Sequence, residues 1–156
     1  MKKLLTIAVL TLLTCAPVFS QTTDQKGTIS YQGSVSLNGY FFGDLGVGLH
    51  TSHGVRLSGL YTGISLESIV TFKSSINVAA HVKYYAPTAP GWQGFVGLEV
   101  GGIVTNPPTE PGVTITPSAG FLYCFKNDMK IEFGPRFMWI INYPLPIIGT
   151  SLTFSF

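Results

Sequence analysis

The sequence has little charge. Charged residues make up 10% of its 156 positions, against roughly 25% in an average soluble protein. Lys2 and Lys3 account for the net charge of +2, because the other seven of the nine basic residues balance the seven acidic ones. Since no basic patch is left over, we expect no nucleic-acid partner.

Long apolar runs and paired cysteines are also lacking. After residue 20, no stretch approaches the roughly 18 apolar residues of a membrane-spanning helix. The two cysteines, Cys15 and Cys124, predict no disulfide framework, because the first falls in an N-terminal leader, where its lipidation is one alternative. Yet the mean hydropathy is +0.37. A hydrophobic, charge-poor chain without membrane helices is typical of a membrane β-barrel.

The N-terminus has the pattern of an export signal. The apolar core, Leu4–Leu13, follows two lysines and is too short to span a bilayer. Val18 and Ser20 occupy the small −3 and −1 positions of a cleavage site. We therefore predict a cleaved signal peptide at residues 1–20 and one β-barrel domain at residues 21–156.

Apolar residues alternate with small or polar ones along most of the remaining chain, a period of two that indicates β-strands. The pattern and its turn signals predict about eight strands, near residues 28–37, 45–57, 60–67, 76–85, 95–101, 113–125, 130–141 and 148–156. Longer connections are expected on one side, at 38–44, 70–75, 106–112 and 142–147, and short ones on the other, at 58–59, 86–92 and 126–128. The predicted fold is all-β: an antiparallel, up-and-down transmembrane barrel.

Charged and histidine side chains fall on one face of these strands, together with many Gly and Ser residues, and bulky aliphatic side chains fall on the other. In a membrane barrel the aliphatic face meets lipid and the polar face lines the lumen. Charges in a narrow lumen lose water and should pair with one another. We therefore predict a closed, polar lumen that holds a charge network of Arg56, Glu67, Lys83, Glu99, Lys130, Glu132, Arg136, His50 and His81.

Periodicity alone leaves a second architecture open. A secreted soluble barrel turns its apolar face inward and binds a small apolar ligand there. Such a barrel needs Lys and Glu spread densely over its outside, and this chain has too few of them.

The last strand alternates apolar and hydroxyl residues and ends on an aromatic. With Leu152, Phe154 and Phe156 it resembles the C-terminal insertion signal of bacterial outer-membrane barrels. Together with the segments 53–56 and 95–101, the mature chain is similar to small barrels of the OmpA/OmpX type and to uncharacterised Gram-negative outer-membrane barrels. The resemblance implies a location in the outer membrane, with outer-membrane lipid and the barrel assembly machinery as partners.

Some barrels of this size modify lipid A, so a hydrolase is a further alternative. His50 and Ser52 share a face, with Glu67 on the next strand, but that face points into the lumen, away from lipid esters. His50 and His53 point to opposite faces, so they predict no metal site. We therefore expect no enzymatic activity and no cofactor. The expected role is structural or surface interaction, and the residues specify no extracellular partner.

Overall fold

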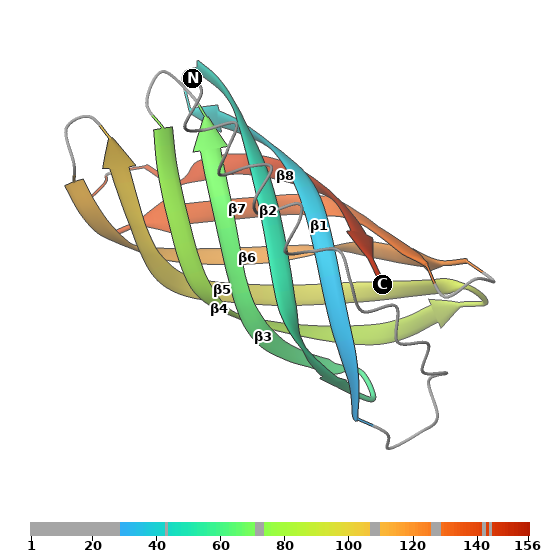
Figure 1. The fold of residues 1–156 in the computed structure, drawn as a ribbon. Coiled ribbons are helices and arrows are strands. Elements are labelled where there is room, and N and C mark those ends of the chain that lie inside the picture. The colour runs from blue at the N-terminus through green and yellow to red at the C-terminus, as the bar shows by residue number, and fades with distance from the viewer. Residues whose placement is uncertain are drawn as a thin grey trace.

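The computed structural model describes residues 29–42, 44–70, 74–106, 110–125, 129–141, 143 and 145–156. They form one closed antiparallel barrel in which each strand pairs with the next and the last returns to the first (Figure 1). The strands are β1 (Ile29–Phe42), β2 (Asp44–Leu57), β3 (Leu60–Val70), β4 (Ser74–Ala89), β5 (Trp92–Asn106), β6 (Glu110–Cys124), β7 (Lys130–Ile140) and β8 (Ile147–Ser155). The described ranges contain no helix that is long and apolar enough to cross a membrane. The predicted signal peptide lies outside these ranges.

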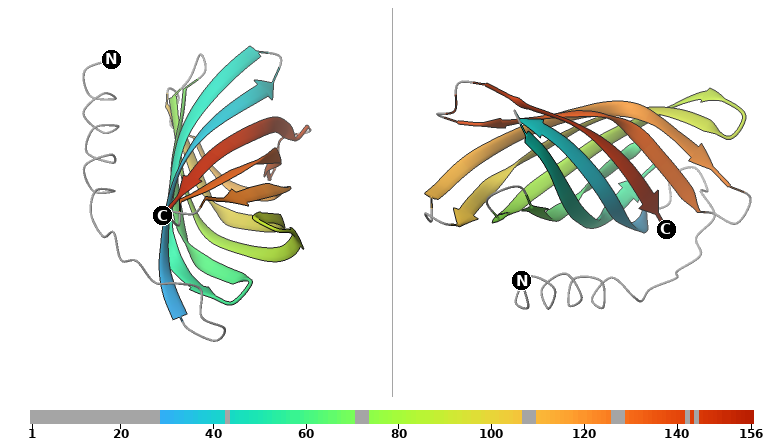
Figure 2. Two further views of the ribbon diagram at one scale, coloured as in Figure 1. Left: turned by 90° about the vertical axis from the view of Figure 1, so that its right-hand side faces the viewer. Right: turned by 90° about the horizontal axis from the view of Figure 1, so that it is seen from above.

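Strands β1 and β8 close the barrel. Their ladder runs from Ser34–Ser155 to Phe41–Ile148. Beyond it, the backbone of Phe156 exchanges two hydrogen bonds with Gly33, at 2.9 and 3.0 Å. Figure 2 shows this continuous, steeply inclined wall from two further sides. Closure satisfies the backbone groups that an open sheet edge would expose.

The two ends of the barrel differ in what they carry. One end, here called the terminal end, holds the start of β1, the end of β8 and the connections β2–β3, β4–β5 and β6–β7. The opposite end, called the distal end, holds the other four connections. At the terminal end, Ser58 and Gly91 have positive φ angles of 53° and 77°. This left-handed backbone conformation favours glycine, which Gly91 supplies in the β4–β5 turn.

Several strands extend beyond their predicted ends. The connection predicted at 38–44 is wrong, because β1 continues to Phe42 and Asn38 pairs with both Gly48 and Ser151. An Asn-Gly pair often forms a hairpin turn. Here the strand continues instead, and the side chains of Asn38 and Tyr40 both point into the barrel.

Two other predicted connections are shorter than expected. Strand β4 runs to Ala89, with a register shift between Pro87 and Ala89, so the turn shrinks from 86–92 to Pro90 and Gly91. Strand β6 begins at Glu110, inside the connection predicted at 106–112. Pro111 is tolerated there because it pairs only toward β5, beyond the last β6–β7 pair, Thr114–Ile140.

Two prolines interrupt one seam of the wall. Pro117 pairs with Leu98 on β5, and Pro135 pairs with Thr150 on β8. Between β6 and β7 the ladder has gaps on either side of the Ser118–Arg136 pair, within residues that the structure describes. Each proline lacks the N–H that a complete ladder needs, which explains the interruption.

Glycine pairs allow the wall to bend tightly. Gly54 and Gly63 face each other across β2 and β3. A Cβ on Gly54 would lie 2.2 Å from the carbonyl oxygen of Thr62, and one on Gly63 would lie 2.3 Å from that of His53. Glycine without a Cβ lets two backbones approach this closely.

We expect Gly63→Ala to destabilise the barrel by about 1–3 kcal/mol, because the added Cβ must displace backbone rather than a flexible side chain. Urea unfolding of the refolded barrel measures this loss. Gly39→Ala is the matched control, because the nearest atom to its Cβ, in Thr150, is 3.7 Å away. Equal stability of the two variants would contradict the close approach.

Buried apolar side chains form one packed cluster toward each end of the interior. Near the distal end, the distal cluster contains Tyr40, Ile69, Ile103 and Met138. Toward the terminal end, the terminal cluster contains Tyr61, Tyr85, Phe95 and Leu122. The remaining buried interior side chains, between and around these clusters, are mostly polar or charged.

Candidate functional site

Among the described residues, six formally charged side chains lie in the interior, each no more than 7% exposed. They come from five strands and balance as three cations and three anions: Arg56, Lys83, Arg136, Glu67, Glu99 and Glu132. Lys130, the fourth predicted cation, is only half-buried at the first residue of β7, at the terminal end. Among the described side chains, the buried charges are therefore three cations and three anions, without the fourth cation that the sequence predicted.

Glu132 is bound by three side chains. Lys83 Nζ donates to Glu132 Oε2 at 2.6 Å. The hydroxyl groups of Tyr85 and Ser155 donate to Oε1 at 2.9 and 3.1 Å. A buried carboxylate requires this number of donors to offset its lost hydration.

Glu67 forms the second centre. Arg136 Nη2 contacts Glu67 Oε2 at 3.3 Å, and Asn38 Nδ2 donates to Oε1 at 2.6 Å. The hydroxyl of Tyr40 also donates to Oε1, and the Arg136 guanidinium lies 5.6 Å from the centre of the Tyr40 ring. The same Nη2 reaches Glu99 Oε2 at 3.5 Å, so Arg136 joins two carboxylates.

Arg56 lies closer to the terminal end. It donates to the carbonyl oxygen of Ser58 at 2.9 Å and to Gln93 Oε1 at 3.1 Å. Its guanidinium lies 4.5 Å from the centre of the Tyr85 ring. Neutral acceptors and an aromatic face thus stabilise this cation.

Glu99 is the third centre, and both predicted histidines meet it. His50 Nε2 lies 3.4 Å from Glu99 Oε1, and His81 Nε2 lies 3.6 Å from the same oxygen. Ser65 Oγ donates to Glu99 Oε2 at 3.3 Å, and Ser36 Oγ lies 3.3 Å from His50 Nδ1. Three strands, β2, β4 and β5, therefore bring two imidazoles and one carboxylate together.

A cavity of about 10 Å³ lies among Ser36, His50, Lys83, Glu99 and Arg136, with neighbours from β5, β6 and β8. That volume fits about one water molecule. The described side chains around this cavity therefore leave room for little more than one water molecule.

The residues considered for a hydrolase have separate partners. Ser52 Oγ hydrogen-bonds Ser34 Oγ at 2.7 Å, whereas His50 contacts Ser36 and Glu99. Glu67 binds Asn38, Tyr40 and Arg136, as described above. A Ser–His–acid relay needs these groups bonded in series, and Ser52, His50 and Glu67 are not bonded to one another.

Sequence reasoning missed several members of the network. Asn38 and Tyr40 fell in a predicted connection, and Tyr85 and Ser155 drew no attention because they carry no formal charge at neutral pH. The alternation of side chains along each strand was the available signal, since all four residues lie on the inward face of their strands.

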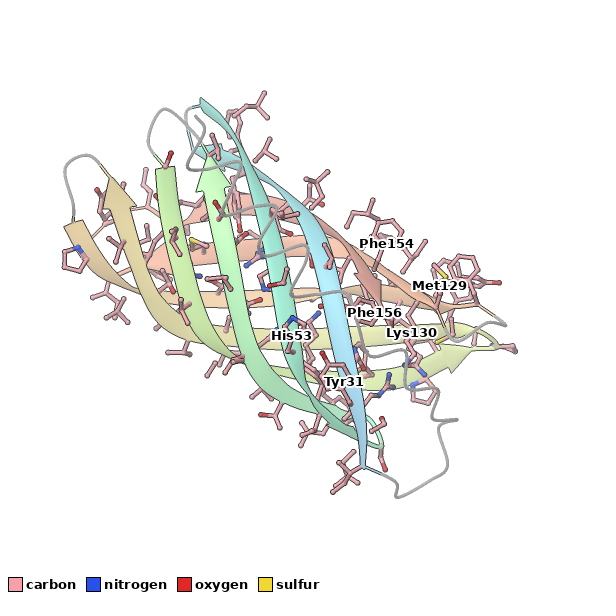
Figure 3. All side chains as sticks on the ribbon, viewed as in Figure 1. Tyr31, His53, Met129, Lys130, Phe154 and Phe156 are labelled. Carbon is pink, nitrogen blue, oxygen red and sulfur yellow. The ribbon has the colours of Figure 1, made fainter. Side chains whose placement is uncertain are left out.

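The exterior carries the apolar residues. Leu152 and Phe154 of the predicted insertion signal point outward, and Figure 3 shows Phe154 with Phe156 near the terminal end. Also on the exterior, the hydroxyl of Tyr31 on β1 forms a hydrogen bond of 2.5 Å with His53 Nδ1 on β2; both residues are labelled in Figure 3. An apolar groove of about 490 Å³ crosses β4 to β7, with Tyr84 and Phe121 among its lining residues and Pro135 on β7.

Several solved structures share this fold. The N-terminal β-barrel domain of Pseudomonas aeruginosa OprF aligns with a TM-score of 0.66 and 13% identity, covering 85% of this chain and all of that domain. Neisserial surface protein A (NspA) aligns at 0.63 and 11%, covering 82% and 96%. The outer membrane enzyme PagL aligns at 0.55 and 13%, covering 80% and 97%.

No family model and no curated protein sequence matches the chain. The structural similarity confirms the expected fold, a closed eight-stranded barrel of the OmpA/OmpX type that outer-membrane proteins use. At sequence identities of 11–13%, the similarity shows a common fold and does not show a common chemistry.

Proposed function

We propose that this chain is an integral outer-membrane protein whose barrel is closed to ions and whose role is structural or surface interaction. One observation carries the proposal. The barrel holds its ionic groups inside and its large apolar groups outside, the reverse of a soluble protein.

The apolar exterior supports membrane insertion. Large apolar side chains are exposed on all eight strands, with Leu45 82% and Ile64 68% exposed. In water, a continuous surface of this kind would drive association. In a bilayer it meets acyl chains, which satisfies both the apolar exterior and the closed backbone ladder.

The packed interior supports the absence of a conducting pore. A hydrated ion crossing the barrel would have to displace the distal cluster, the terminal cluster and the paired charges between them. The same packing opposes the soluble alternative, because a ligand-binding barrel of that class needs an apolar internal cavity, and the interior cavity described here is small and polar.

The proposal includes the partners that the resemblance implied. Leu152, Phe154 and Phe156 present an outward apolar series at the closing strand, which suits recognition by the barrel assembly machinery. We also propose that the protein is not a lipid A hydrolase, because Ser52, His50 and Glu67 have separate partners in the interior.

The strand bounds limit the form of any surface contact. One residue separates β1 from β2, three separate β3 from β4, three separate β5 from β6 and six separate β7 from β8. With the termini on the periplasmic side, as is usual for such barrels, these connections face outward. A partner would therefore contact a short rim rather than long loops.

Two measurements test the proposal. Cell fractionation should place the folded protein in the outer membrane, released by detergent and with heat-modifiable gel mobility. Planar bilayers containing the purified barrel should show no steady conductance under conditions in which a general porin, the positive control, gives large steps. A freely dissolved periplasmic species would refute the membrane location, and steady large conductance would refute the closed interior.

A further inference from the structure

The nitrogens around Glu99 are buried and poorly satisfied. His81 is 0% exposed, and neither of its ring nitrogens has a hydrogen-bond partner among the described residues. His50 Nε2 is also buried without a hydrogen-bond partner among the described residues. Buried polar atoms are nearly always paired, so each exception calls for a physical explanation.

The distances around Glu99 Oε1 are not those of hydrogen bonds. At 3.4 and 3.6 Å, the two imidazole nitrogens stand beyond the usual N–H···O range. Zinc bonds of about 2.0–2.1 Å in tetrahedral geometry place neighbouring ligand atoms roughly 3.3–3.5 Å apart. The three ligand atoms also lie within 4.8 Å of one another, so one ion fits between them.

We propose that His50, His81 and Glu99 form a buried binding site for a divalent transition-metal ion of the zinc class. Each ligand comes from a different strand, β2, β4 or β5, so the ion would tie together half of the barrel wall. Two imidazoles and one carboxylate favour zinc or a similar metal over calcium or magnesium, which prefer oxygen ligands.

Neighbouring groups orient the ligands for this task. Ser65 and Arg136 contact Glu99 Oε2, which leaves Oε1 directed at the two imidazoles. Ser36 Oγ holds His50 at Nδ1, leaving Nε2 for the metal. Such outer contacts fix the orientation and protonation of metal ligands. The cavity of about 10 Å³ beside His50 and Glu99 has room for a water as fourth ligand.

Charge accounts for the choice of Glu99 among the interior carboxylates. Glu132 faces Lys83 at 2.6 Å, and Glu67 faces Arg136 at 3.3 Å. Glu99 shares Arg136 at the longer distance of 3.5 Å. Glu99 is thus the carboxylate without a cation at close range of its own, and the one that both imidazoles face.

The burial of the ligands determines how the ion enters. His50, His81 and Glu99 are each no more than 4% exposed, so we expect the metal to be taken up as the barrel folds, when the ligands are still accessible. Metal bound in this way should resist a chelator added after folding.

The test is refolding of the mature chain into detergent micelles with Zn²⁺ or Co²⁺, followed by a chelator wash and elemental analysis. We expect about one tightly held ion per barrel, and with Co²⁺ the visible absorption of a four-coordinate nitrogen and oxygen site. Loss of an outer contact typically weakens metal sites ~10–100-fold, so loss of a ligand in His81→Gln should weaken binding by at least about 100-fold. His53→Gln is the control, because His53 lies on the exterior.

Heat-modifiable gel mobility establishes that each variant has folded. Should His81→Gln fail to fold, the Co²⁺ spectrum and chelator resistance of the unmodified barrel decide the matter alone. Wild-type barrels without retained metal, or equal retention by folded His81→Gln, would overturn the site.

Discussion

Replacing Arg136 with Met should destabilise the barrel by about 3–5 kcal/mol, the usual cost of removing one partner from a buried ion pair. Arg136 is 3% exposed and contacts both Glu67 and Glu99. Its loss would leave two carboxylates in the interior with too few donors. Urea unfolding of barrels refolded into lipid vesicles, followed by tryptophan fluorescence, measures the change.

A double variant separates lost charge pairing from lost packing. Adding Glu67→Gln to Arg136→Met removes one orphaned carboxylate, so the pair should cost less than the sum of the two single changes. Lys130→Met, on the same strand but half-buried at its start, should cost about 1 kcal/mol or less. An Arg136→Met barrel as stable as the wild type would contradict the ionic network.

Leu122→Ala should cost about 2–5 kcal/mol, because it opens a void in a packed interior. Leu122 is 0% exposed and packs in the terminal cluster with Tyr61, Tyr85 and Phe95. Three aromatic rings and the strands behind them restrict collapse into the void. Urea unfolding under the same conditions measures the loss.

Leu98→Ala is the matched exterior change, since Leu98 is 45% exposed on the outer face of β5. Surrounding lipid or detergent fills the space that this truncation leaves, so its cost should be clearly smaller. If both substitutions lowered the free energy of unfolding equally, the terminal cluster would not be the tightly packed layer that the structure describes.

Much of the fold was predictable because its periodicity is local. Strands β2, β7 and β8 begin and end within one residue of their predicted bounds, since their alternation stops where the strand does. The end of β1 and the start of β6 were not predictable, because Asn38 and Pro111 carry turn signals that the neighbouring strands override.

The candidate site was predictable as a set of residues but not as a set of contacts. The period-two alternation of the sequence placed Glu99 and His81 on the inward face of their strands. Their meeting depends on the β4–β5 register, in which they are direct partners. The contact between Arg136 on β7 and Glu67 on β3 crosses the barrel, and strand tilt decides such contacts. No spacing along the chain records that tilt.

The two apolar clusters have a consequence for the environment in which this barrel works. Mobile ions weaken attraction between charges that they can approach, and they have much less effect on buried pairs. With the distal and terminal clusters toward its ends and each of its charged side chains no more than 7% exposed, the ionic core is largely inaccessible to them. The contribution of these pairs to stability is therefore nearly the same in dilute medium and in brine.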